Sequence, residues 1–193
     1  PFFKQKTAYE IGVRLVGSEM CIRDSGCKYV LPFENRGDEV GVTLHHPHGQ
    51  IYGFERVPMV QQRAVDAFAG GYDLESEISA AMPEYGIEEQ GGIAALVPRY
   101  ARFPYEVWLA PRVRREGLWD CSDEELDALA HMLGEVTRRY DALFEGPAAT
   151  MMAFHAAPAG GSAGYHFTVQ FYPLLRAPGT VSYTHLRAHE TDS

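Results

Sequence analysis

The stretch "DEVGVTLHHPHGQIYGF", residues 38–54, contains three of the eight histidines of the chain within four positions. Before the histidines, apolar side chains alternate with other residues, which is the period of a half-buried strand: Val40, Val42 and Leu44. Pro47 has no N–H group and disfavours a helix. Continued through the histidines, the alternation places five side chains on one strand face: His46, His48, Gln50, Tyr52 and Phe54. We therefore expect a strand with a polar row next to Gly49, whose missing Cβ leaves room for a ligand.

Three interpretations of this row compete. The histidines are hydrogen-bonded and inert, or His46 and His48 bind zinc, or one imidazole attacks phosphorus. Zinc needs three or four protein ligands, and the neighbouring sequence offers no clear cysteine or carboxylate partner. A neutral imidazole can attack phosphorus and form a covalent intermediate, while Gln50 can donate a hydrogen bond to a phosphoryl oxygen. The row therefore favours nucleophilic catalysis on a phosphorus centre.

The composition excludes some classes of partner. A chain of 193 residues that is 46% hydrophobic can bury a core, as one domain or two small ones. The net charge of −9 argues against nucleic acid or an anionic membrane as a partner. No apolar run approaches the about 20 residues that span a bilayer. The three cysteines lack metal-site or disulfide spacing, which favours the cytoplasm: Cys21, Cys27 and Cys121.

The two ends differ in composition from the middle of the chain. The middle is rich in Ala, Gly and Arg, whereas "FFKQKTAYEIGVRLVGSEMCIRDS" and "VSYTHLRAHETDS" are not. Both end segments resemble translated sequencing adaptors. We therefore expect residues 1–25 and 181–193 to be artefactual tails and residues 26–180 to be authentic.

The middle of the chain alternates strand and helix patterns. We expect a strand at 29–33 followed by a turn at 35–38, a short helix ended by Gly70 and Gly71, and a connector at 75–90. Four further strands are predicted: 93–100, 105–112, 149–158 and 163–173. In the last of them, one face is apolar and the other polar: Tyr165, Phe167, Val169 and Phe171 against His166, Thr168 and Gln170.

The clearest helix lies at 121–147. Ser122 and Glu125 form a capping box, and Gly146-Pro147 ends the helix. Apolar residues recur every three or four positions along it: Leu126, Leu129, Leu133, Val136, Tyr140 and Leu143. His131 lies off this stripe and is expected at the surface. Hairpin-connected strands with a long returning helix predict an α+β fold of antiparallel sheets with packed helices.

The segment "FENRGDEVGVTLHHPHGQIYGF", residues 33–54, resembles the galactose-1-phosphate uridylyltransferase family, a branch of the histidine-triad superfamily. The family pattern, Phe-Glu-Asn followed by a glycine-bearing segment and His-Pro-His-Gly-Gln, matches without a gap. Downstream, "FHAAP" and "FTVQFYPLLRAPG" resemble the second half of the family in the right order. The resemblance implies a histidine-triad-like fold with parts of two related domains. Residues 26–60 would end the N-terminal domain and carry the active site, and 61–180 would be a truncated C-terminal domain.

The resemblance also implies a role for each residue of the motif. His48 would be the nucleophile that takes UMP from UDP-glucose and passes it to galactose 1-phosphate, and Gln50 would orient the phosphate. Three residues would line the nucleotide and its phosphates: Asn35, Gly41 and Thr43. His46 would be a ligand of a structural zinc, and the full-length enzyme would be a homodimer. A nucleotidyl phosphorylase or hydrolase of the same superfamily is the alternative, as is an inactive nucleotide-binding fragment.

The chain departs from the family at both metal sites. The other zinc ligands would precede residue 26, and Cys27 lies too close to the Asn35 strand to replace them. The second, iron-type site of the family uses a glutamate and three histidines. Here only one of those histidines is present, and the four positions read Ala64, His155, Thr168 and Gln170. We expect no metal at this second site.

Overall fold

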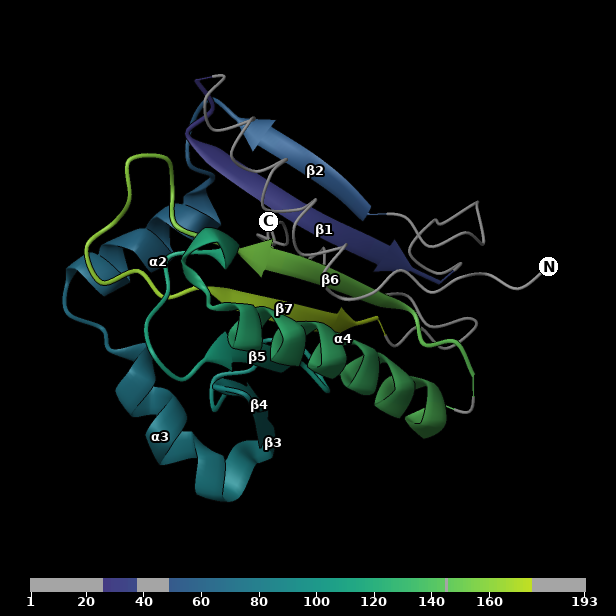
Figure 1. The fold of residues 1–193 in the computed structure, drawn as a ribbon. Helices are drawn as coiled ribbons and strands as arrows, with labels where there is room; N and C mark the ends of the chain where they lie inside the picture. Colours follow the sequence, from purple (N-terminus) through teal and green to yellow (C-terminus); the bar gives the residue numbers. More distant parts are fainter. Residues whose placement is uncertain (1–25, 38–48, 145, 175–193) are drawn as a thin grey trace, which may run out of the picture.

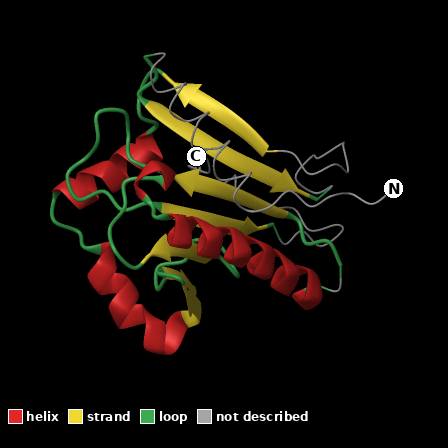
Figure 2. Cartoon of the chain, in the orientation of Figure 1, coloured by secondary structure: helices red, strands yellow, loops and turns green. Residues whose placement is uncertain are grey.

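The computed structural model describes residues 26–37, 49–144 and 146–174. Their strands form a seven-stranded sheet in the order β2-β1-β6-β7-β5-β4-β3, and all neighbouring strands are antiparallel (Figures 1 and 2). The strands are β1 Tyr29–Arg36, β2 Gly49–Phe54, β3 Gly86–Gln90, β4 Ile93–Leu96, β5 Val107–Pro111, β6 Thr150–His155 and β7 Thr168–Pro173. The helices are α2 Met59–Ala69, α3 Leu74–Tyr85, α4 Asp123–Leu143 and the short 3₁₀ helix η2 Leu118–Asp120. This architecture confirms the predicted α+β fold.

Helix α4 covers one face of the sheet. Ser122 caps it, and the predicted capping box with Glu125 is present. The buried side of the helix packs against β4, β5 and β7 in one apolar cluster: Leu129, Met132, Val136 and Tyr140 against Ile93, Leu109, Phe167, Val169 and Phe171. His131 is exposed, as expected. Leu143 was predicted to be part of the apolar stripe, but it is 55% exposed because it is the last residue of the helix.

Helices α2 and α3 cover the opposite face. Their cluster contains Phe68 and Ile78 from the helices and Ala94 and Ala110 from β4 and β5. Along β4 and β5, side chains therefore alternate between this face and the face that packs against α4. Tyr165 belongs to this second cluster and packs against Phe68, with 5.0 Å between the ring centroids. The expectation that Tyr165 shares a face with Phe167 is therefore wrong, because the strand begins only at Thr168.

The segment predicted to be a connector, 75–90, instead forms α3 and β3. Asp73 caps the helix by accepting hydrogen bonds from the backbone N–H groups of Glu75 and Ser76, at 3.1 and 3.4 Å. Leu74, Ile78 and Ala81 are buried against the sheet. Pro83 lies inside the helix, close to its end. Burial of one apolar side outweighs the unfavourable proline in a helix that has a good cap.

Strand β1 continues further than its sequence predicts. The segment "NRGD" reads as a turn, but Asn35 and Arg36 belong to the strand because they pair with Met151 and Thr150 of β6. This pairing also joins the predicted segments 26–60 and 61–180 in one sheet. At its end, Arg36 makes two hydrogen bonds to the Asp141 carboxylate of α4, at 2.6 and 2.7 Å.

Several expectations lie outside the described residues. These include the tails 1–25 and 181–193 and the first part of the histidine strand, 38–48. The domain boundaries therefore stay a prediction. None of the helices in the described part of the chain is long and apolar enough to span a membrane.

Candidate functional site

Gln50 and Asn35 lie on adjacent strands at one edge of the sheet. Gln50 is the second residue of β2, and its register partner on β1 is Phe33. Directly paired residues point to the same face, and Asn35 follows Phe33 by two positions on the same strand. Gln50 and Asn35 therefore face the same side of the sheet.

The predicted alternation along the histidine strand is confirmed for its described part. The Tyr52 hydroxyl donates a hydrogen bond to Oε1 of Gln50 at 3.2 Å, which requires both side chains to lie on one face. The rings of Tyr52 and Phe54 are 6.4 Å apart, and Tyr52 also meets Phe33 edge to face at 4.8 Å. Because Tyr52 holds the amide oxygen of Gln50, the amide nitrogen is left as the group that can donate to a ligand.

Asn35 has an unused acceptor. Its Oδ1 atom is buried and has no hydrogen-bond partner within the described part of the chain. A buried polar atom without a partner costs about 1–3 kcal/mol, so it points to a missing donor. This acceptor fits the nucleotide-binding role that the family resemblance implies for Asn35.

Four predicted site residues lie outside the described residues: Gly41, Thr43, His46 and His48. In the sequence, His48 immediately precedes Gly49, the first residue of β2. Among the residues that are described, no three histidine, cysteine or acidic side chains come together to hold a metal ion.

A second polar region lies on the same face, further into the sheet. Phe33 pairs with Ala153 of β6, and Ala153 pairs with Gln170 of β7. Gln170 in turn pairs with Trp108 of β5. Neighbouring strands are about 4.8 Å apart, so Gln50 and Gln170, three strand spacings from each other, are separated by about 14 Å.

A cavity of about 270 Å³ lies above this inner region, between the sheet and α2. Ala64 and Phe68 line it from α2, and Trp108 lines it from β5. His155, Thr168 and Gln170 line it from β6 and β7. The strand pairing and the helix therefore bring together residues that are more than 100 positions apart in the sequence.

His155 and Tyr172 form the core of a hydrogen-bond network in this cavity. His155 Nε2 lies 3.1 Å from the Tyr172 hydroxyl, and Nδ1 lies 3.4 Å from the hydroxyl of Tyr29. Tyr172 donates to Oε1 of Gln170, and Nε2 of Gln170 donates to the Thr168 hydroxyl at 2.9 Å. Burial, with a smaller contribution from the positive charge of Arg102, lowers the pKa of His155 from 6.5 to about 4. The imidazole is therefore neutral at pH 7.

Arg102 brings a positive charge to the same network. Its Nη2 donates to Oε1 of Gln170 at 3.2 Å and to the Tyr172 hydroxyl at 3.1 Å. The carboxylate of Glu106, which is fully buried, accepts hydrogen bonds from the backbone N–H of Arg102 at 2.7 Å and from Trp108 Nε1 at 2.7 Å. Glu106 thus fixes the loop that carries Arg102.

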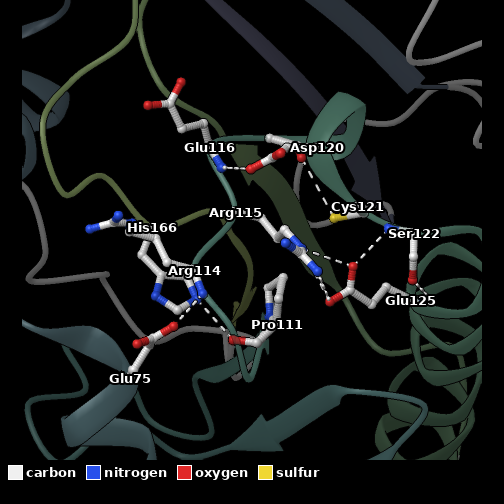
Figure 3. A network of polar contacts seen from close by, with 11 residues as sticks. Glu75, Pro111, Arg114, Arg115, Glu116, Asp120, Cys121, Ser122, Glu125 and His166 are labelled. Carbon is white, nitrogen blue, oxygen red and sulfur yellow. Dashed lines mark hydrogen bonds and ion pairs between the residues drawn. The ribbon is translucent and has the colours of Figure 1, made fainter.

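His166 lines the cavity but has a structural role. Its Nε2 lies 2.8 Å from the carbonyl oxygen of Pro111, which can only accept, so this nitrogen carries the proton (Figure 3). Burial is the main cause that lowers the His166 pKa. In the same figure, the guanidinium of Arg115 binds both carboxylate oxygens of Glu125 beside the start of α4. These contacts anchor the segment that follows β5.

The sequence indicated Gln50 and Asn35 but not the residues around Arg102. Arg102 contacts Gln170 and Tyr172 across 68 and 70 positions, and no local pattern marks such a contact. The available signal is indirect: this chain has Thr168 and Gln170 at two positions where the family resemblance implies histidines.

Comparisons with known proteins agree with this fold. A family model for the galactose-1-phosphate uridyl transferase C-terminal domain matches residues 77–182, and a model for the N-terminal domain of the same enzymes matches residues 13–58. Galactose-1-phosphate uridylyltransferase of Thermotoga maritima is 40% identical over 162 residues, which are 77% of this chain and 50% of that protein. The Haemophilus influenzae protein of the same name is 34% identical over 188 residues, 91% of this chain and 54% of that protein.

A solved structure of a uridylyltransferase mutant superimposes with a TM-score of 0.78 at 27% identity, covering 88% of this chain and 58% of that one. The antiparallel sheet with its helices is thus the fold of a uridylyltransferase. The chain belongs to the galactose-1-phosphate uridyl transferase family. It spans about half the length of the curated relatives that it matches.

Proposed function

We propose that this chain carries the nucleotidyl-transfer site of an enzyme that moves UMP from UDP-glucose to galactose 1-phosphate. The observation that carries the proposal is the geometry of Gln50. It stands at the start of β2, on the same face as Asn35, and its amide oxygen is already engaged by Tyr52. Membership in the family supports the same reaction.

The proposed reaction has two steps with His48 as the covalent carrier. In the first, a ring nitrogen of neutral His48 attacks the phosphorus of the UMP group, an N–P bond forms, and the P–O bond to glucose 1-phosphate breaks. In the second, a phosphate oxygen of galactose 1-phosphate attacks the same phosphorus, UDP-galactose leaves, and His48 is free again. The leaving group in both directions is a stable anion that needs little acid assistance.

Gln50 and Asn35 have separate tasks in this scheme. The amide nitrogen of Gln50 donates to a phosphoryl oxygen, and charge develops on that oxygen in the transition state. Asn35 offers its buried oxygen to a donor group of the nucleotide. Gly41 and Thr43 are proposed to line the nucleotide and its phosphates.

The alternative is a nucleotidyl phosphorylase or hydrolase, or a fragment that binds nucleotide without turnover. Gln50 argues against hydrolysis because an amide cannot accept a proton from water at neutral pH. Product analysis separates the candidates. Transfer from UDP-glucose yields UDP-galactose only when galactose 1-phosphate is present, whereas hydrolysis yields free UMP without it.

The remaining proposals concern the full-length protein. We propose that His46 binds a structural zinc together with ligands outside this chain, and that the enzyme is a cytoplasmic homodimer. Zinc takes part in no step of the transfer and would organise the loops beside the site. The 193-residue chain should accordingly bind less than one zinc, whereas a full-length protein with the family ligands should bind about one per subunit.

The test uses a full-length protein carrying this chain and UDP-glucose labelled in the uridine. His48→Ala should leave no label on the denatured protein. Gln50→Ala should still acquire label, but about 10²–10³ times more slowly. His46→Ala should lose zinc or stability and keep labelling. If His48→Ala acquires label on a histidine and His46→Ala does not, the nucleophile has been assigned to the wrong residue.

A further inference from the structure

The cavity under α2 is where the family resemblance would place a second metal. The family resemblance places four ligands of that metal at Ala64, His155, Thr168 and Gln170 of this chain. All four line the same cavity. The folded chain therefore gathers these positions, and their chemistry can be compared with what a metal requires.

The four side chains do not fit a transition metal. They supply one imidazole, one hydroxyl, one carboxamide and one methyl group, whereas such sites are built from three or more imidazole, thiolate or carboxylate ligands. The polar atoms are also engaged with each other. Gln170 uses its oxygen toward Tyr172 and its nitrogen toward Thr168.

The proton positions follow from the donors around His155. Tyr172 gives its hydroxyl proton to Gln170, so toward His155 it can only accept. Nε2 of His155 is therefore the protonated nitrogen, and its remaining lone pair, on Nδ1, lies toward the Tyr29 hydroxyl. A metal would have to displace one of these tyrosines to reach the imidazole.

Arg102 contributes a positive charge to this network of polar side chains. Its guanidinium reaches Gln170 and Tyr172 from the loop between β4 and β5 and lies over the Tyr172 ring, 5.4 Å from the centroid. The buried Glu106 holds the backbone of this loop and lies 3.6 Å from the guanidinium. The loop is thus tied to β7 by a charged side chain that belongs to the chain itself.

We propose that in this protein the guanidinium of Arg102 takes the place of the family's second metal ion. It cross-links the loop before β5 to β7 and makes this part of the fold independent of metal. The proposal concerns stability and metal content and does not depend on the proposed transferase activity, so either can fail alone.

Metal uptake provides the first test. The 193-residue chain is stripped with a chelator and dialysed against Co²⁺, alongside its His155→Gln variant. Both should retain the same amount of Co²⁺, because no ion depends on His155. A variant that restores the ligands, Ala64→Glu with Thr168→His, Gln170→His and Arg102→Ala, should retain one more Co²⁺ per chain. Bound Co²⁺ that the wild type holds and His155→Gln loses would overturn the proposal, whether or not the restored variant folds.

Thermal unfolding provides the second test. Arg102→Met should lower the Tm by about 4–8 °C, because two charge-assisted hydrogen bonds are lost. Arg99→Met is the matched control. Arg99 lies in the same loop, is half exposed and lies 3.9 Å from Glu84. Its substitution should shift the Tm by about 1 °C. Added chelator should not lower the Tm of the wild type by removing a metal from the cavity under α2. Equal shifts for the two arginine variants would contradict the role given to Arg102.

Discussion

Acid should destabilise this protein through His155 before most carboxylates titrate. The pKa of the imidazole is 6.5 in an unfolded chain and about 4 in the folded one. Between these values the unfolded state binds more protons, so the free energy of unfolding falls as the pH falls through this window. Each pKa unit corresponds to 1.36 kcal/mol, so the full effect is about 3 kcal/mol, of which about 2 kcal/mol develops between pH 7 and pH 4.5.

The surroundings of His155 support this direction. It faces the hydroxyls of Tyr29 and Tyr172 and the guanidinium of Arg102, none of which would stabilise an imidazolium by an opposite charge. His166 lines the same cavity, and its pKa is also lowered by burial, so it adds to the acid sensitivity in the same direction.

Urea unfolding at pH 7 and at pH 4.5, for the wild type and for His155→Gln, measures the contribution. The variant should be less stable than the wild type at pH 7, because glutamine reproduces the two hydrogen bonds poorly. It should lose about 2 kcal/mol less between the two pH values, since its side chain does not titrate. An identical pH dependence in both proteins would refute the lowered pKa of this imidazole.

The remaining predictions concern contacts that hold the sheet to its helices. Arg36→Met and Asp141→Asn should each lower the free energy of unfolding by about 1 kcal/mol, because the two side chains form a bidentate pair that is about one-third exposed. A double-mutant cycle should show a coupling energy between them. Additive effects would show that the pair contributes nothing. Ser122→Ala should lower the urea stability by about 1 kcal/mol through loss of the cap on α4, whereas Ser122→Thr should retain most of it. Glu106→Gln should lower the free energy of unfolding by about 2 kcal/mol, because an amide offers only one oxygen to the backbone and Trp108 donors. A near-neutral effect in thermal unfolding would count against the anchoring role of Glu106.

The features predicted from the sequence are those with local causes. Helix α4 carries its own signals, a capping box and an apolar stripe, and both are present in the structure. The alternation along β7 also survives, because Phe167, Val169 and Phe171 meet the core beneath α4 while Thr168 and Gln170 face the cavity. In both elements the period of the side chains and the buried face agree.

The segments whose secondary structure was predicted wrongly are those in which contacts with residues distant in the sequence determine that structure. Pro83 and a run of acids suggested a connector, yet burial of Ile78 against the sheet favours a helix. Asn35 has the local signature of a turn, and it becomes a strand residue because β6 pairs with it. The motif located Asn35 and Gln50, whereas Arg102 and Tyr172 joined the second region through contacts that no short window contains.

The pairing of β1 with β6 has a consequence for the order in which the protein can be made. Arg36 and its partner Thr150 are 114 positions apart. At 5–20 residues per second, a ribosome needs about 6–23 s to synthesise the intervening chain. During that time one side of β1 has no strand to pair with, and an unpaired strand edge invites association with other chains. Among the described strands, the one that carries Asn35 is therefore the first to be synthesised, and its pairing is completed only after β6 has followed.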